Sequence, residues 1–85
     1  MVFFVYILEC GDRSLYTGIA KDLEDRLKQH STGKGSRYVR SRLPFRVVYR
    51  ETLGTRSQAL IRENQIKAMS RREKLRLIMN NSEPE

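Results

Sequence analysis

The chain has 85 residues, of which 39% are apolar and 32% charged, and it contains a single cysteine, Cys10. This length allows one small domain; no apolar run reaches the ~20 residues of a membrane span, and a lone cysteine excludes an internal disulfide or a cysteine-built zinc site. Seventeen Lys and Arg against ten Asp and Glu give a net charge of +7, which is typical of a protein that binds a polyanion.

The first predicted element is a strand over residues 2–9, which is rich in Val, Phe, Tyr and Ile on both alternating faces. This pattern is typical of a strand buried on both sides. Its apolar start lacks a basic segment before it, so we expect no signal peptide. The single cysteine fits a reducing cytoplasm, which is the expected location. A turn at residues 10–13 and a second strand over residues 14–18 predict a hairpin that places Tyr6 opposite Tyr16.

A helix is predicted to begin after Asp22, which is a good N-cap residue. Arg26 and His30 lie four residues apart and therefore share one face of this helix. Gly33 and Gly35 end it in a mobile, basic loop.

Residues 45–52 predict a third strand, because Pro44 prevents a helix before it and Val and Tyr follow. A capping box over residues 55–58 predicts a second helix that ends near Met69. Ala59, Ile66 and Met69 recur at helical spacing and should face the core, with Glu63 close to the same stripe.

A second capping box over residues 70–73 predicts a last helix that contains Leu75, Ile78 and Met79. Residues 1–79 then form one domain, and residues 80–85 a flexible C-terminal tail. The order strand, strand, helix, strand, helix, helix predicts an α+β fold.

The positive charge is concentrated between Arg26 and Arg50, where there are eight Lys and Arg and no Asp or Glu. The remainder of the chain therefore carries a net charge of −1. A contiguous basic segment interleaved with aromatic residues favours nucleic-acid binding over a merely solvated surface.

An ordered set of residues along the chain carries a family resemblance. Residues 5–7 are Val-Tyr-Ile, residues 16–18 are Tyr-Thr-Gly, Arg26 lies ten residues after Tyr16, and Glu63 lies in the second predicted helix. This set resembles the GIY-YIG nuclease domain, which is named for two tripeptides in adjacent strands. The resemblance covers residues 2 to 79 and implies a three-stranded antiparallel sheet flanked by three helices.

Further positions resemble the small stand-alone bacterial members, which consist of little but this domain. They include Glu9, Cys10, Ser14, His30, Gly33-Lys34-Gly35, Tyr38, Arg40, Pro44, Ala59, Arg62, Lys67 and Lys74.

The resemblance implies a metal-dependent phosphodiesterase with one Mg²⁺ or Mn²⁺ ion held by Glu63. Arg26 would stabilise the charge that develops on the phosphate. Tyr6 and Tyr16 would order the attacking water, and one of them would take its proton, with His30 as a second candidate for proton transfer. Each residue alone also fits a plain structural role; Glu63, for example, can pair with Arg62 or Lys67 on the helix surface.

The sequence departs from the family pattern after the second motif. Ile19 stands where excision-repair relatives have a lysine, and Lys21 is the nearest substitute. Many relatives also use an asparagine beyond the helix that bears the glutamate, a role that we assign to neither Asn64 nor Asn80.

Contacts to nucleic acid, most simply DNA, are assigned to Lys21, Lys34, Arg37, Tyr38, Arg40 and Arg42. Tyr38 either stacks on a base or packs within the protein. We interpret the chain as a Mg-dependent DNA endonuclease or nickase of low sequence specificity, with a role in DNA repair or recombination and with any specificity supplied by a partner protein. The alternatives are a non-catalytic nucleic-acid-binding module and a subunit that delivers this domain to a larger repair complex.

Overall fold

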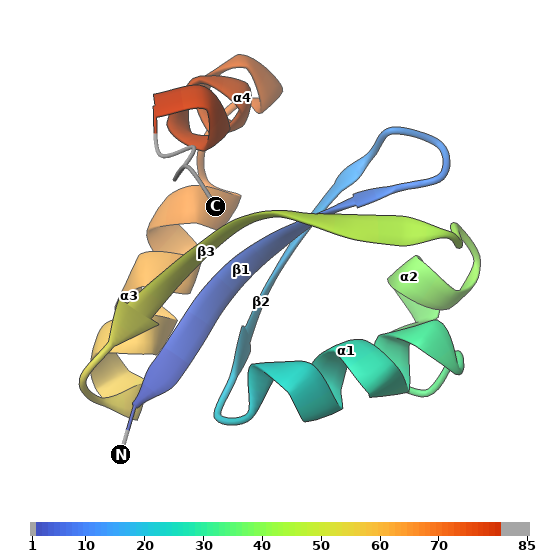
Figure 1. Ribbon diagram of the computed structural model, residues 1–85. Helices are drawn as coiled ribbons and strands as arrows, with labels where there is room; N and C mark the ends of the chain where they lie inside the picture. The colour runs from blue at the N-terminus through green and yellow to red at the C-terminus, as the bar shows by residue number, and fades with distance from the viewer. Residues whose placement is uncertain (1, 81–85) are drawn as a thin grey trace.

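The computed structural model describes residues 2–80 of the chain. A three-stranded antiparallel sheet is flanked by four helices (Figure 1). The elements in chain order are β1 (Phe3–Cys10), β2 (Leu15–Ala20), α1 (Leu23–Ser31), α2 (Arg37–Arg40), β3 (Phe45–Leu53), α3 (Arg56–Lys67) and α4 (Arg71–Asn80). This confirms the predicted α+β fold, with α2 as an additional short helix.

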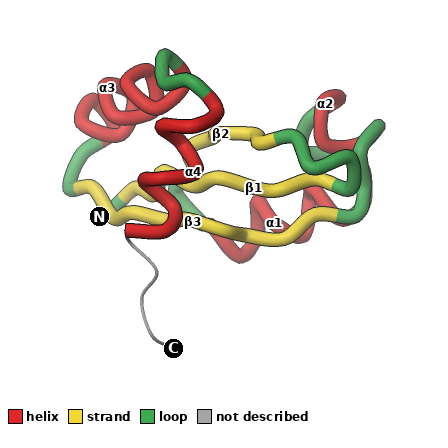
Figure 2. The backbone as a smooth tube through the Cα atoms, turned by 90° about the horizontal axis from the view of Figure 1, so that it is seen from above, coloured by secondary structure: helices red, strands yellow, loops and turns green. Residues whose placement is uncertain are grey.

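Strand β1 lies in the middle of the sheet, between β2 and β3 (Figure 2). One face of the sheet packs against α1 and α2 in a core cluster that contains Tyr6, Leu8 and Val39. The other face packs against α3 and α4 in a second cluster that contains Val5 and Ile66. The prediction that the first strand is buried on both faces is therefore confirmed, since its residues 5–8 are fully buried.

The register of the β1–β2 hairpin differs from the predicted one. Tyr6 pairs with Gly18, and Tyr16 pairs with Leu8, so the two tyrosines are diagonal neighbours on one face and not opposite each other. The reason is the turn, which is centred on Asp12 and closed by hydrogen bonds between Cys10 and the residues that follow it. Moving the centre of the turn by one residue shifts the partner of every strand residue by two, and residues two apart remain on the same face.

Helix α1 begins as predicted, because the carboxylate of Asp22 accepts a hydrogen bond from the backbone N–H of Asp25 at 3.0 Å. It ends before Gly33, whose φ of 82° lies in the left-handed region that glycine adopts without strain. The segment predicted to be a mobile loop instead contains α2, because the Ser36 hydroxyl caps its first N–H groups.

Both predicted N-caps are present at the starts of α3 and α4, but only the second forms a complete capping box, because the Gln58 side chain accepts from the N–H of Gly54 and not from that of Thr55. Thr55 accepts a hydrogen bond from the N–H of Gln58, and Ser70 and Glu73 exchange reciprocal bonds of 2.8 and 3.1 Å. Ala59 and Ile66 are fully buried, as their spacing predicts.

The apolar face of α4 was only partly predicted. Ile78 packs against the core together with Leu77, whereas Leu75 is 39% exposed and Met79 is 75% exposed. The side of α4 that faces the sheet therefore carries Leu77 and Ile78. Asn80, predicted to open the tail, is the last residue of α4, and the rest of the predicted tail lies outside the described residues.

Cys10 is buried and forms no disulfide. Within residues 2–80, no helix has the length and apolar character needed to cross a bilayer.

Candidate active site

Tyr6 and His30 form the centre of the candidate site. The Tyr6 hydroxyl lies 2.9 Å from Nε2 of His30, and both side chains are fully buried. Tyr6 is held by the central strand β1, and His30 projects from the last turn of α1. The fold thus brings a phenol and an imidazole that are 24 residues apart in the chain into direct contact.

Gly18 is required for this placement of the Tyr6 ring. A Cβ atom at position 18 would lie 2.6 Å from the Tyr6 hydroxyl oxygen and 2.8 Å from Cζ. The glycine of the second tripeptide therefore leaves room for the tyrosine of the first, across the β1–β2 pair.

Tyr16 joins this pair from the edge strand β2. Its ring centroid lies 6.5 Å from that of Tyr6 and 5.5 Å from that of His30, within the range of edge and tilted aromatic contacts. On its other side, Tyr16 stacks on Tyr38 of α2, with centroids 5.7 Å apart and an interplanar angle of 28°. The two tyrosines and the histidine predicted to act together are thus brought together.

His30 is held in a shielded pocket. Phe45 contacts its ring edge-on at 5.9 Å, and a Cβ at Gly35 would lie 2.6 Å from Nδ1. Burial and the neighbouring charge of Arg26 lower the pKa of His30, so the ring is neutral at pH 7. Its Nε2 is hydrogen-bonded to Tyr6, whereas its Nδ1 is buried without a hydrogen-bond partner.

The electrostatics of Tyr6 link it to two charged residues on different helices. Burial raises the pKa of Tyr6 to about 12, and the negative charges of Tyr16 and Glu63 add to this rise, while Arg26 opposes it. Arg26 lies on α1 and donates a hydrogen bond to the backbone carbonyl of Ile19 at 3.3 Å. Both the guanidinium and the carboxylate therefore affect the pKa of the same phenol.

Glu63 lies on α3, the helix that packs against β2 and β1 on the other face of the sheet. Its side chain is only 14% exposed, and its Oε2 lies 3.3 Å from Nζ of Lys67. Arg62 does not pair with it but bonds Glu51 of β3, which also accepts a hydrogen bond from Tyr49. Of the two ion pairs considered from the sequence, the one with Lys67 forms.

The donor set near Glu63 suits a hard, largely hydrated cation. Within residues 2–80, no cluster of three His, Cys, Asp or Glu side chains forms a metal cage. Mg²⁺ commonly binds through one or two carboxylates and fills its other positions with waters and phosphate oxygens. A single, mostly buried carboxylate whose charge reaches Tyr6 therefore fits such an ion, and Glu63 is the residue that would hold it.

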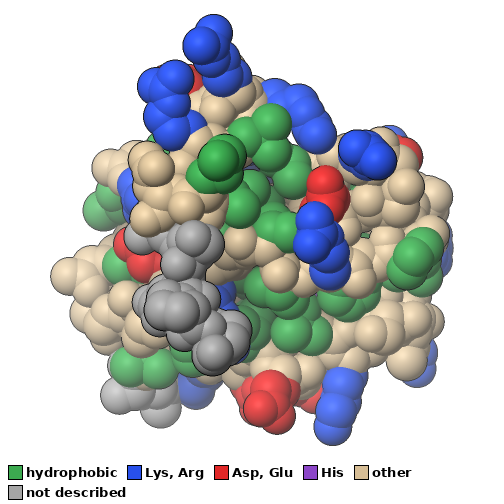
Figure 3. Space-filling view, turned by 45° about the horizontal axis from the view of Figure 1, so that its top comes forward, with side chains coloured by type: hydrophobic (Ala, Val, Ile, Leu, Met, Phe, Trp, Pro, Cys, Tyr) green, Lys and Arg blue, Asp and Glu red, His purple; other side chains and the backbone are tan. Residues whose placement is uncertain are grey.

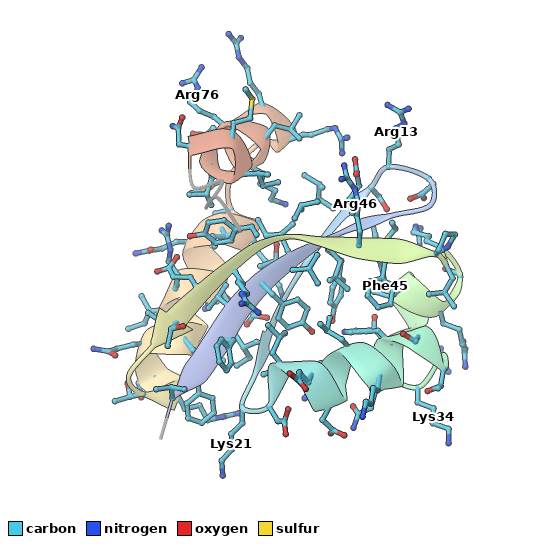
Figure 4. All side chains as sticks on the ribbon, viewed as in Figure 1. Arg13, Lys21, Lys34, Phe45, Arg46 and Arg76 are labelled. Atoms are coloured by element: carbon cyan, nitrogen blue, oxygen red, sulfur yellow. The ribbon has the colours of Figure 1, made fainter. Side chains whose placement is uncertain are left out.

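The basic residues assigned to nucleic acid differ in exposure and lie in two places on the chain. Lys34, Arg37 and Arg40 are exposed around α2, and Arg42 is partly covered. Lys21 is exposed at the turn between β2 and α1 and points outward (Figure 4). No contact joins Lys21 to Tyr6 or Tyr16, so the structure does not bring it to the position that Ile19 leaves without a lysine.

Two residues with a place in the site were not found from the sequence. Gly35 covers the free edge of His30, and Phe45 contacts its ring. Gly35 carried a signal, because two glycines close together after a helix predict more than one close backbone approach. Phe45 carried none, since an aromatic residue that opens a strand is ordinary core.

Comparison with known proteins shows the family to which the chain belongs. Residues 2–76 match the model of the GIY-YIG catalytic domain. The chain is 49% identical to a UPF0213 protein of Staphylococcus saprophyticus over 75 residues, which are 88% of this chain and 92% of that protein. A UPF0213 protein of Staphylococcus epidermidis is 51% identical over the same shares.

Two solved structures are similar to the chain over nearly its whole length. One is the solution NMR structure of a UPF0213 protein from Bacillus halodurans, with 42% identity and a TM-score of 0.65 over 99% of this chain and 89% of that one. The other is the solution NMR structure of a protein from E. faecalis, with 28% identity, the same TM-score, and coverage of 100% and 92%.

Proposed function

Because the chain belongs to the GIY-YIG family, a nuclease superfamily, we propose that it is an endonuclease that cleaves DNA with low sequence specificity. The proposed reaction is hydrolysis of a phosphodiester bond with one Mg²⁺ or Mn²⁺ ion. The observation that carries the proposal is the contact of the Tyr6 hydroxyl with His30 and of its ring with Tyr16, with Arg26 on the same helix as His30.

Glu63 would hold the ion, with the other positions taken by waters and an oxygen of the scissile phosphate. When bound, the ion polarises the phosphate and stabilises the leaving 3′ oxygen. The planar guanidinium of Arg26 would donate hydrogen bonds to the phosphate as negative charge develops on it. Its anchor on the carbonyl of Ile19 limits the directions in which it can point.

Proton transfer from the attacking water would use the buried phenol–imidazole pair. A phenol with a pKa of about 12 keeps its proton at neutral pH and is a poor base by itself. Neutral His30 can accept the phenolic proton at Nε2, and the Tyr6 oxygen, which is fully buried without substrate, would take a proton from the water once DNA binding uncovers it. Tyr16, with an intermediate exposure beside the pair, would order that water.

Binding of the DNA backbone would depend on the exposed cations around α2, namely Lys34, Arg37 and Arg40. Phosphate contacts fix the position of a nucleic acid and carry no sequence information directly. We therefore propose cleavage of low specificity in the cytoplasm, in DNA repair or recombination, with sequence choice left to a partner protein.

The test is nicking of supercoiled plasmid by the purified protein with Mg²⁺. The control variant Glu24→Ala removes an exposed carboxylate from α1 and should nick like the wild type, whereas Glu63→Ala should lose activity. EDTA should abolish nicking by the wild type.

Two other outcomes would overturn the proposal. Nicking that survives both Glu63→Ala and EDTA would exclude the metal role of Glu63. Salt-sensitive DNA binding without any cleavage would instead identify the non-catalytic binding module.

A further inference from the structure

We propose that Arg42 is a positioning residue that fixes Tyr16 through Tyr38, and that it is not a ligand of nucleic-acid phosphate. Its effect on cleavage rests on the proposed endonuclease function, whereas its effect on Tyr16 does not. The sequence alone groups Arg42 with the other cations near α2, and the structure separates it from them.

Three of the five N–H donors of Arg42 are already used within the protein. Nε donates to Oδ2 of Asp12 at 3.0 Å, and Nη1 donates to the carbonyl of Tyr38 at 3.1 Å and to the Ser41 hydroxyl at 2.9 Å. The side chain is 34% exposed. Arg37 and Arg40, which lie on α2 just before Arg42, are exposed. Arg42 thus has the fewest free donors of the three.

Its charge is also compensated. The ion pair with Asp12 places a carboxylate beside the guanidinium, so the pair as a unit attracts a polyanion far less than a free arginine does. A phosphate bound through the remaining Nη2 donors would lie close to the Asp12 carboxylate, which would repel it.

The face of the guanidinium covers the ring of Tyr38. Cζ of Arg42 lies 3.9 Å from the ring centroid, which is the geometry of a cation–π contact. The Tyr38 ring stacks on Tyr16 at 5.7 Å, and Tyr16 contacts His30 at 5.5 Å. A continuous series of ring contacts therefore leads from Arg42 to the buried pair.

The same arginine holds the turn from which the strand of Tyr16 begins. Asp12 accepts hydrogen bonds from the N–H and hydroxyl of Ser14, immediately before β2, while its other oxygen accepts from Arg42. The backbone also joins the two segments, because the Gly11 N–H donates to the carbonyl of Arg42 at 2.7 Å. A Cβ at Gly11 would lie 3.0 Å from the Leu43 carbonyl, so the turn is seated closely on this segment.

Arg42 therefore acts on Tyr16 in two ways. Through Tyr38 it packs against the ring, and through Asp12 it fixes the start of the strand. A residue that only binds phosphate would need neither the contact with Tyr38 nor that with Asp12. A residue that positions Tyr16 would use both.

The experiment compares Arg42→Gln with Arg40→Gln, since each variant removes one positive charge from the same part of the molecule. Binding of a fluorescent DNA duplex is measured in EDTA at several salt concentrations. A lost phosphate contact lowers the slope of log K against log salt by about 0.9. We expect this decrease for Arg40→Gln, and for Arg42→Gln an unchanged slope and an affinity within about twofold of wild type.

A second measurement follows the tyrosine rings by NMR with ring-labelled tyrosine. Arg42→Gln should shift the Tyr16 and Tyr38 ring signals, and Arg40→Gln should leave the Tyr16 signal in place. With Mg²⁺ present, Arg42→Gln should lower kcat at least tenfold at an unchanged KM, while Arg40→Gln should mainly raise KM.

Asp12→Asn provides an independent variant, because asparagine keeps the turn and releases Arg42 from its ion pair. We expect a Tyr16 ring shift together with a steeper salt slope, since a freed guanidinium becomes available to phosphate. A salt slope reduced equally by Arg42→Gln and Arg40→Gln, or a Tyr16 signal unmoved by Arg42→Gln, would overturn the inference. If the wild type does not cleave DNA, the proposed function fails, and the slopes and ring signals still decide the role of Arg42.

Discussion

The hydroxyl of Tyr6 and Nε2 of His30 lie 2.9 Å apart, and neither side chain exposes any surface to solvent. Burial opposes the charged form of both groups, so it raises the pKa of the phenol and lowers that of the imidazole. The pair is therefore neutral across the whole neutral pH range. The free energy of unfolding should therefore depend on pH on both sides of this range. His30 determines the dependence on the acid side, and Tyr6 that on the alkaline side.

On the acid side, His30 should make the fold less stable as the pH falls. Its pKa in the folded protein is lowered, so between that value and the unfolded pKa near 6.5 the unfolded chain binds a proton that the native chain does not. The free energy of unfolding then decreases with falling pH, by up to about 1.4 kcal/mol per pH unit for one proton. Urea unfolding at pH 5, 6, 7 and 8 should show this slope, and His30→Gln should lack it. Equal slopes in the two proteins would contradict the prediction.

On the alkaline side, Tyr6 should make the fold less stable as the pH rises. Its pKa is about 12 in the folded protein against 10.0 for a free phenol, so the native state retains a proton that the unfolded state releases above pH 10. Two units correspond to about 2.7 kcal/mol of stability, present below pH 10 and lost progressively up to pH 12. Urea midpoints between pH 9 and 11.5 should fall more steeply for the wild type than for Tyr6→Phe. Parallel curves would show that the phenol titrates normally.

The fold could be predicted from the sequence because its local signals agree with one another. Asp22, Thr55 and Ser70 each begin a helix through a side-chain cap, and each does so in the structure. The short helix α2 was missed because its four residues present no apolar periodicity, and a single serine cap decides it.

The site was predicted less completely, because its geometry depends on turns and on close approach. The hairpin register depends on the length of the turn around Asp12, and a shift of this register moves Tyr16 from beside Tyr6 to a diagonal position. The pairing of Arg42 with Asp12 spans 30 residues, and nothing in the spacing of charges indicates it. The pairing of Lys67 with Glu63 lies within one helix and could be read directly from the sequence.

Gly18→Ala should destabilise the protein by about 1–3 kcal/mol, because the added methyl group would lie 2.6 Å from the Tyr6 hydroxyl in a fully packed core. Gly54→Ala is the matched control, since its new Cβ meets only the flexible end of Gln58 at 3.3 Å, and its stability should stay within about 0.5 kcal/mol of wild type. Both values come from urea unfolding at pH 7. Equal effects of the two substitutions would show that Tyr6 can move away from Gly18.

The charge around the sheet is not confined to the segment near α2. Figure 3 shows Lys and Arg side chains standing around a central apolar area on the face that includes α4. Metal binding at Glu63 must therefore be separated from general effects of net charge. Lys67 allows this, because its Nζ lies 3.3 Å from the carboxylate proposed to hold the ion.

Lys67→Gln should strengthen Mn²⁺ binding. An ammonium beside the Glu63 carboxylate repels an incoming dication, and a partly exposed ion pair of this kind is worth about 0.3–1 kcal/mol, so its removal should lower the Kd for Mn²⁺ about two- to fivefold. Lys28→Gln removes the same charge from an exposed site on α1 and should leave the Kd close to wild type. Free Mn²⁺ is measured by EPR during titration, with Glu63→Gln as the variant without binding. Equal affinities for Lys67→Gln and Lys28→Gln would show that Lys67 does not compete with the ion for Glu63.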